Sequence, residues 1–265
     1  MTRTAIIAGA GALPAALVAA MPVRPLVCAL DGFQPAGLTP DHVFRVERLV
    51  PFLRMLGDEG VARVVFAGAV QRPRLDPSLF DPQTALMVPR LLAALQQGDD
   101  ATLRVVVALF EEAGLSVVGV PDIAPALVPG AGVLCGTLTP RNETDATRAA
   151  EIVAALGAVD VGQGAVVQHG LCLAVEALAG TDAMLAQVAG MGALRAKGAA
   201  GVFYKAPKPG QDLRIDLPTI GVDTVRNTAH AGLGGIAWQA GGVICLDLPG
   251  MIALAQGLGL FLWAR

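Results

Sequence analysis

Short apolar runs alternate with helical patterns through the first half of the chain, and this alternation restricts the fold more than any other feature. The strand candidates are 4–8, 25–30, 61–68 and 115–120, and the helix candidates are 13–21, 49–60, 84–97 and 100–114. Parallel strands are buried on both faces and form continuous apolar runs, whereas helices repeat every 3.6 residues. The pattern predicts βαβ units, and with them a Rossmann-like, mostly parallel sheet.

The segment 121–140 divides the chain, because it is rich in proline and glycine and has no sustained periodicity. We place the boundary after residue 132, so that 1–132 form an N-terminal Rossmann-like α/β domain and 133–265 a C-terminal catalytic α/β domain. Strand candidates and helix candidates also alternate in the second half, with strands at 164–168, 171–175, 202–205 and 235–238 and helices at 143–156, 182–190, 223–231 and 249–258. The second domain is expected to contain a mixed sheet.

Composition excludes some classes of partner. The chain is 54% hydrophobic and 15% charged, with a net charge of −3 and only three lysines. It therefore lacks the basic surface that nucleic acids require, and we expect no nucleic-acid partner. The high hydrophobic content is compatible with a lipid-like ligand and with a peripheral contact with the cytoplasmic membrane surface. A homodimer is among the assemblies that the sequence allows.

The four cysteines lie far apart and form no CxxC pair. We expect them to be buried, free thiols in a cytoplasmic protein. The uncharged stretch 4–23 is interrupted by Gly9, Gly11 and Pro14, which predicts a strand, a turn and a helix rather than a membrane span or a signal peptide.

Gly9 and Gly11 follow the first strand candidate and precede a helix candidate. In this context glycines let backbone N–H groups approach a phosphate at a helix N-terminus. Pro14 replaces the third glycine of the dinucleotide fingerprint, and Asp31 is the one acidic candidate for a ribose contact. A tight turn, a phosphate or sugar contact and an NAD(P) site are the three interpretations.

Polar residues also stand beside other predicted elements. Gln71 and Arg72 come after the strand candidate 61–68, where ligands of open α/β sheets bind. Asp99 and Asp100 precede a helix, and they either cap it or bind a ligand. The same two alternatives, capping or a role at the site, hold for Thr181 and Asp182 at the start of another helix candidate.

The stretch 204–221 carries the highest density of chemically active side chains: Lys205, Lys208, Gln211, Asp212, Arg214, Asp216 and Thr219. Its prolines predict a stiff, extended backbone whose alternate side chains converge on one ligand. Lysine and arginine suit a pyrophosphate, and carboxylates suit Mg²⁺ or a base that activates water. On an extended segment Asp212 and Asp216 lie about 13 Å apart at about 3.3 Å per residue. Both could not bind one ion at this distance, so we expect them to have different roles.

Other hydrolase signatures are missing from the sequence. His42, His169 and His230 form no HxH, HExxH or HxxxH pair. There is also no Gly-x-Ser-x-Gly elbow, no Walker lysine loop and no motif of the calcineurin-type phosphoesterases. The stretch 204–221 is therefore the main candidate for the site.

Several runs, in this order along the chain, resemble the LpxI family of UDP-2,3-diacylglucosamine pyrophosphatases. They are Ile7-Ala8-Gly9 with Gly11 and Leu13-Pro14, Gly68-x-Val70-x-Arg72-Pro73, Gly98-Asp99-Asp100, Val161-Gly162-Gln163, Val175-Glu176-Ala177, Gly180-Thr181-Asp182-Ala183-Met184, Lys205-Ala206-Pro207-Lys208-Pro209-Gly210-Gln211-Asp212 and Asp216-Leu217-Pro218-Thr219-Ile220-Gly221. Each run is weakly specific, but together they span almost the whole chain.

The resemblance implies a Mg²⁺-dependent hydrolase of lipid A biosynthesis that converts UDP-2,3-diacylglucosamine to UMP and 2,3-diacylglucosamine 1-phosphate (lipid X). It also implies an essential aspartate in the second domain. Asp216 is the first candidate for this aspartate, Asp212 the second and Asp182 the third, and Asp216 and Asp212 are the expected metal ligands. The expected substrate-binding residues are Gly9, Gly11, Gln71, Arg72, Asp99, Asp100, Thr181, Lys205, Lys208, Gln211 and Thr219.

Two other classes of function remain as alternatives. An NAD(P)-dependent oxidoreductase would use the glycine turn at residues 9–11. A non-catalytic carrier of acyl-sugar lipids would bind the acylated UDP-sugar without releasing UMP.

Overall fold

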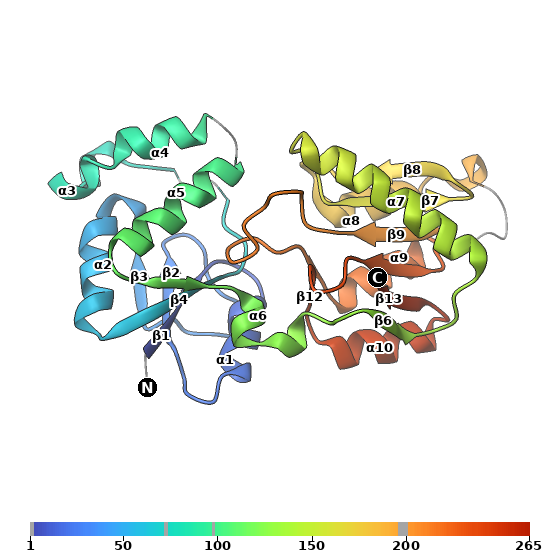
Figure 1. The fold of residues 1–265 in the computed structure, drawn as a ribbon, viewed down its shortest axis with the longest axis horizontal. Helices are drawn as coiled ribbons and strands as arrows, with labels where there is room; N and C mark the ends of the chain where they lie inside the picture. Colours follow the sequence, from blue (N-terminus) through green and yellow to red (C-terminus); the bar gives the residue numbers. More distant parts are fainter. Residues whose placement is uncertain (1–2, 72–73, 97–98, 196–200) are drawn as a thin grey trace. The chain divides into compact units, whose positions relative to one another are not determined.

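The computed structural model describes residues 3–71, 74–96, 99–195 and 201–265, without the side chains of Asp99, Asp100 and Ala193. By their contacts the residues form two compact units (Figure 1). The first comprises 1–125 and 212–216, and the second comprises 126–211 and 217–265. The contacts thus divide the chain at 125/126, whereas the sequence analysis divides it at 132/133. Five residues of the stretch 204–221 belong to the first unit.

The first unit is a doubly wound α/β fold. Its strands are β1 (Arg3–Ala8), β2 (Leu26–Leu30), β3 (His42–Phe44), β4 (Val61–Ala67) and β5 (Ser116–Val118). They pair in the order β3-β2-β1-β4-β5, and all four pairings are parallel. The Rossmann-like sheet expected from the sequence is confirmed, with β3 as a strand that the sequence analysis does not predict.

Helices cover both faces of this sheet, which is why its central strands β2, β1 and β4 are mostly apolar and buried. The helices are α1 (Leu13–Ala20), α2 (Leu49–Asp58), α3 (Pro82–Ala85), α4 (Val88–Leu95), α5 (Asp99–Glu112) and α6 (Val120–Ile123). Buried side chains of α2, α4 and α5 form one core with β1, β2, β4 and β5. Helix α6 contacts both α1 and β4.

The single helix predicted at 84–97 is wrong, because the structure has two helices there, α3 and α4. The Asp81 side chain caps α3 by accepting hydrogen bonds from the N–H groups of Gln83 and Thr84. Pro89 lies in the first turn of α4. Proline has no N–H for an intrahelical hydrogen bond and clashes with the preceding turn, so the helix ends and restarts before it.

The second unit is also α/β, and its main sheet is mixed as expected. Its strands are β6 (Gly132–Cys135), β7 (Gly164–Gln168), β8 (Leu171–Val175), β9 (Val202–Lys205), β11 (Gly235–Trp238) and β13 (Phe261–Ala264), in the order β6-β13-β11-β9-β7-β8. Strands β9, β11 and β13 are parallel, whereas the pairings β13–β6, β7–β8 and β7–β9 are antiparallel. Two short strands, β10 (Thr219–Ile220) and β12 (Ile244–Cys245), pair separately in parallel.

Helices also cover both faces of the main sheet of the second unit. They are α7 (Pro140–Ala158), α8 (Gly180–Ala189), α9 (Val222–His230) and α10 (Leu248–Gly257). Helix α7 packs on one face, against Val202 and Tyr204 of β9. The other three helices share a core with Phe203. Because side chains alternate along a strand, Lys205 at the end of β9 lies on the Phe203 face, beside α8.

Two further expectations from the sequence concern the four cysteines and a membrane span. Cys28, Cys135 and Cys245 are buried free thiols, but Cys172 is exposed, because it lies on the edge strand β8. No helix within the described ranges is long and apolar enough to cross a membrane.

A buried carboxylate holds the β7–β8 hairpin. Asp145 of α7 is fully buried, and its two oxygens accept hydrogen bonds from the N–H groups of His169 (2.9 Å) and Gly170 (2.7 Å). His169 is in the left-handed region, with φ at 54°. The carboxylate satisfies N–H groups that the tight turn leaves unpaired.

We expect Asp145→Ala to lower the free energy of unfolding by about 1–3 kcal/mol, because two backbone donors lose their acceptor. Denaturant titration measures the change. Glu151→Ala removes the exposed ion pair with Arg148 (2.9 Å) on the same helix and is the matched control. Equal destabilisation by the two substitutions would contradict this role for Asp145.

Candidate active site

A buried ion pair lies at the carboxyl end of β9. The Lys205 ammonium donates to Glu176 Oε1 (3.1 Å), Glu176 Oε2 (2.9 Å) and Thr181 Oγ1 (2.6 Å). The side chains of Lys205 and Glu176 are only 5% and 13% exposed. Both β8 and β9 run antiparallel to β7, so their carboxyl ends meet at one edge of the sheet. The structure therefore brings together Lys205 and Thr181, and it adds Glu176.

Two glycines make room for Glu176. A Cβ at Gly162 would lie 1.8 Å from the Glu176 carbonyl oxygen, and one at Gly164 would lie 2.5 Å from Glu176 Oε2. A larger residue at either position would displace the glutamate. This requirement explains the glycine of the Val161-Gly162-Gln163 run.

Helix α8 begins beside this ion pair. Asp182, in its first turn, is exposed and accepts a hydrogen bond from Asn227 Nδ2 of α9 (2.9 Å). The carboxylate of the third catalytic candidate therefore joins the first turn of α8 to α9.

Residues 206–211 form a turn rather than the extended segment expected from the prolines. Gly210 has φ at 79°, and the Gln211 N–H donates to the Lys208 carbonyl (3.2 Å). Gln211 Oε1 accepts from the Lys208 N–H (2.8 Å) and from Gln163 Nε2 (3.0 Å). The Lys208 ammonium contacts Asp160 Oδ1 at 2.5 Å. Side-chain hydrogen bonds thus fold the loop onto the second unit.

The extended backbone expected between Asp212 and Asp216 is also wrong. The N–H groups of Ile215 (3.1 Å) and Asp216 (3.2 Å) both donate to the Asp212 carbonyl, so these residues form a helical turn. The Asp212 side chain accepts the Arg214 N–H (3.0 Å), the local contact by which aspartate favours turns. Residues four apart in such a turn have Cβ atoms about 5–6 Å apart. The two aspartates are therefore much closer than an extended segment allows.

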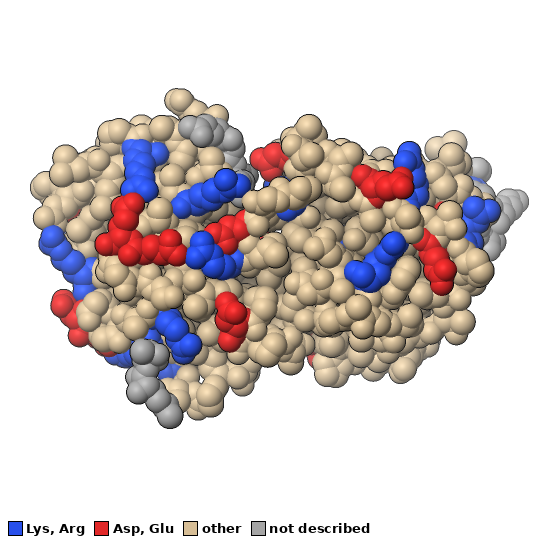
Figure 2. All heavy atoms as spheres, viewed as in Figure 1, with Lys and Arg blue, Asp and Glu red and all other residues tan. Residues whose placement is uncertain are grey.

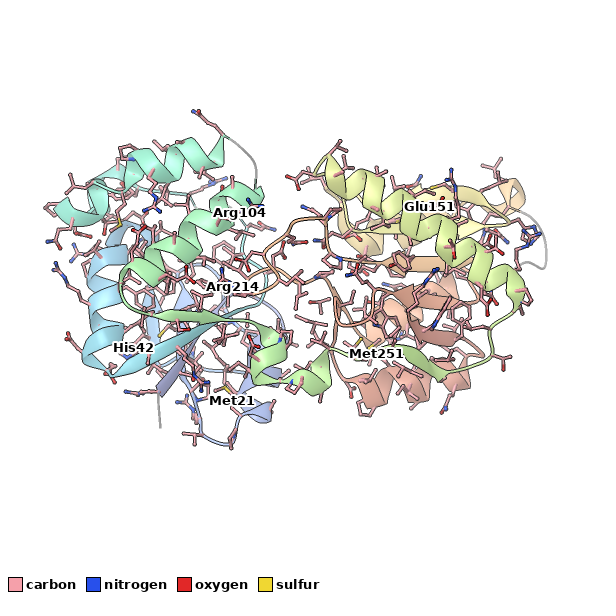
Figure 3. All side chains as sticks on the ribbon, in the orientation of Figure 1. Met21, His42, Arg104, Glu151, Arg214 and Met251 are labelled. Atoms are coloured by element: carbon pink, nitrogen blue, oxygen red, sulfur yellow. The ribbon has the colours of Figure 1, made fainter. Side chains whose placement is uncertain are left out.

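Arg214 holds Asp212 within this turn. Its guanidinium donates to Asp212 Oδ1 (3.0 Å) and Oδ2 (2.7 Å), and also to Glu111 of α5 (2.8 Å). The hydrogen bonds from Arg214 hold the pKa of the Asp212 carboxyl below its usual range, and the nearby Arg104 lowers it further. Figure 3 labels both arginines. Ile215 packs against the core of the first unit, which fixes the turn to that unit.

The glycine turn of the first unit has a packing role. The Gly9 N–H donates to the Ala67 carbonyl (2.8 Å), and a Cβ at Gly9 would lie 2.6 Å from the Ala69 oxygen. Gly11 has φ at 94°. Asp31, the acidic residue that a dinucleotide site would use, pairs with Arg45 at 2.6 Å. These contacts favour the tight-turn interpretation.

The remaining predicted residues lie outside these contacts. Gln71 is exposed in the loop after β4. Arg72 lies outside the described residues, and Asp99 and Asp100 begin α5 without described side chains. Thr219 is in β10, where its hydroxyl donates to the Leu217 carbonyl (3.5 Å).

Four further residues contact the predicted ones: Glu176, Gln163, Asn227 and Asp160. Glu176 and Gln163 stand in runs that resemble the LpxI family but have no predicted role, and Asn227 and Asp160 are not predicted at all. Glu176 has a usable signal, because it directly follows the strand candidate 171–175.

The charged side chains form local pairs. On the face of the first unit in Figure 2, positive and negative side chains lie next to one another, in agreement with the ion pairs Arg90–Glu112 and Arg214–Glu111, both at 2.8 Å.

Two family models match the chain. The model described as the LpxI N-terminal domain matches residues 3–127, and the one described as the LpxI C-terminal domain matches residues 130–263. The chain belongs to the LpxI family. A curated relative from Caulobacter vibrioides, named UDP-2,3-diacylglucosamine pyrophosphatase LpxI, is 38% identical over an alignment of 271 residues, which covers 98% of this chain and 96% of the relative.

The two LpxI domain models separate the site residues. Gly9, Gly11 and Gln71 lie within the matched N-terminal domain, whereas Lys205, Asp212 and Asp216 lie within the matched C-terminal domain. By their contacts, however, Asp212 and Asp216 group with the first unit. The five residues 212–216 are therefore C-terminal in sequence but pack with the N-terminal unit.

The carboxylates of this LpxI chain offer few ligands for Mg²⁺ within the described residues. No group of three His, Cys, Asp or Glu side chains among the described residues could hold a metal ion. Mg²⁺ commonly needs only one or two protein carboxylates, with substrate phosphates and water as further ligands. The turn with Asp212 and Asp216 fits this chemistry, but a metal at Asp212 would compete with the Arg214 guanidinium.

We expect Arg214→Met to raise the pKa of Asp212 toward its ordinary value, because the hydrogen bonds to its carboxylate are lost. Since the pKa of Asp212 is lower in the folded protein, the Arg214–Asp212 contact stabilises the fold above about pH 4 and loses this effect as the pH falls through the folded pKa. Carboxyl ¹³C NMR titration of wild type and variant measures the shift. An unchanged pKa in the variant would contradict the contact.

Proposed function

We propose that this protein hydrolyses the pyrophosphate bond of UDP-2,3-diacylglucosamine, releasing UMP and 2,3-diacylglucosamine 1-phosphate in lipid A biosynthesis. The observation that carries the proposal is the match of both LpxI domains over residues 3–127 and 130–263. The name of the 38% identical relative gives the substrate.

Asp216 is the group that we assign to the reacting centre. The oxygen of a water molecule bonds to one phosphorus, the bridging P–O bond breaks, and the proton of the water passes to a base. Asp212 is bound by Arg214 and has a lowered pKa, which makes it a weak base. Asp216, the first candidate from the sequence and four residues later in the same turn, therefore keeps the assignment as the group that accepts the proton.

A Mg²⁺ ion would bind phosphate oxygens of the substrate together with a carboxylate of the same turn. Such an ion offsets the charge of the pyrophosphate as the bond breaks. The three cations of the stretch 204–221 already have acidic partners: Lys205 is bound to Glu176, Lys208 to Asp160 and Arg214 to Asp212. The pairing of these cations supports a requirement for a metal ion.

The decisive assay incubates the purified protein with UDP-2,3-diacylglucosamine and Mg²⁺ and measures UMP. The expected result is release of UMP and the acylated sugar phosphate in equal amounts. A carrier of acyl-sugar lipids would bind the substrate without forming UMP. An NAD(P)-dependent oxidoreductase would instead show absorbance changes of the nicotinamide with a reducible substrate.

Asp216→Asn should lower turnover by about 10²–10⁴-fold, because it keeps the shape of the side chain but removes the base. Substrate binding should survive, so the variant should retain intact substrate. Asp58→Asn, which changes an exposed carboxylate at the end of α2, is the control.

Two outcomes would refute the assignment of Asp216. One is near-wild-type turnover of Asp216→Asn while Asp182→Asn or Asp212→Asn abolishes it. The other is loss of the folded circular dichroism spectrum, which would make Asp216 a structural residue.

Removal of divalent cations should abolish turnover, and added Mg²⁺ should restore it. The measurement is UMP release in excess EDTA, with the metal content of the protein determined beforehand. Full turnover by metal-free protein would refute the metal requirement.

A further inference from the structure

The Lys205 ammonium already has a complete set of partners inside the protein. An ammonium has three N–H donors, and Lys205 directs its Nζ to three acceptors: both oxygens of Glu176 and the hydroxyl of Thr181. The residue is only 4% exposed. A phosphate could therefore bind Lys205 only by displacing Glu176 or Thr181.

Glu176 is equally fixed. Its N–H donates to the Gly164 carbonyl (2.8 Å), and its backbone and side chain fill the space that Gly162 and Gly164 leave open. The Glu176 carboxylate thus cannot move toward the backbone behind it, and it holds the ammonium at one place.

The third partner of Lys205 belongs to a helix end that has no side-chain cap. The N-cap residue of α8 is Ala179, which makes no capping hydrogen bond, and Gly180 has φ at 81°. The free N–H groups of an uncapped first turn favour fraying. Lys205 joins Thr181 in this turn to the sheet, and Asp182, the next residue, reaches Asn227 of α9.

We infer that Lys205 is a positioning residue for the proposed hydrolysis: with Glu176 it fixes the first turn of α8, and so the place of Thr181 and Asp182, and it does not bind a substrate phosphate. The inference rests on the proposed function for its kinetic test. It replaces the role of phosphate ligand that the sequence analysis gives to Lys205.

Glu176→Gln separates the two roles. For a positioning residue, loss of the carboxylate charge loosens Lys205, so Glu176→Gln and Lys205→Met both lower kcat by about 10-fold to 10²-fold, with KM changed less than about threefold. For a phosphate ligand, Lys205→Met raises KM, whereas Glu176→Gln releases the ammonium and leaves KM equal or lower. The second pattern would overturn the inference.

A double variant guards against loss of the fold, because a single substitution leaves one buried charge without its partner. Lys205→Met/Glu176→Met removes both charges, and such replacements are often neutral for stability. Hydrogen exchange then reports on the helix end. We expect faster exchange of amides 181–185 in the double variant, with no change in the amides of α7. Arg148→Met, which removes an exposed ion pair on α7, should match the wild type in exchange and turnover.

The two proposals fail in different ways. If the wild-type protein releases no UMP, the proposed hydrolysis is wrong, and the exchange measurement still decides whether Lys205 fixes α8. If amides 181–185 exchange at the wild-type rate in the double variant, the positioning role is wrong even when the wild-type protein hydrolyses the substrate.

Discussion

Helices cover both faces of each large sheet, and this burial determines where polar side chains can act. The central strands of the first sheet are mostly apolar and buried, and those of the second sheet pack between α7 on one side and α8, α9 and α10 on the other. A charged side chain inside such a layer would be costly unless it is paired. Charged and polar groups therefore gather at strand ends and in the loops that follow them.

At the strand ends of the second unit, a buried ion pair compensates the cost of removing two charges from water. Lys205 ends β9 and Glu176 follows β8, so each charge is buried beside the other. Glycines 162 and 164 admit the glutamate, and Thr181 accepts the third hydrogen bond. Because breaking one half of a buried pair is far more costly than keeping it, this contact joins the sheet firmly to the start of α8.

In the turn at 212–216 the paired charges are partly exposed rather than buried. Arg214 is half exposed and binds both Asp212 and Glu111, so the turn is held at the surface of the first unit, while Ile215 packs into its core. Within the turn, the guanidinium binds Asp212 and lowers the pKa of its carboxyl. The lowered pKa weakens Asp212 as a base, which is the reason for keeping Asp216, the first candidate from the sequence, ahead of it.

The sequence by itself determined the α/β class, the parallel first sheet and the mixed second sheet, because apolar runs and helical periods are local patterns. Strands β7, β8, β9 and β11 lie where their apolar runs predict. It also determined the family, through short runs that keep their order along the chain. Contacts distant in sequence could not be read in this way. The prolines of 204–221 predicted an extended segment, but the structure has turns at 206–211 and 212–216. Gln163 donates a hydrogen bond to Gln211 of the first turn, and Arg214 of the second pairs with Asp212 and Glu111. Only the tertiary structure decided that Lys205 faces Glu176, since their meeting depends on strand order, and that residues 212–216 pack with the first unit, since Ile215 finds its apolar partners more than ninety positions earlier in the chain.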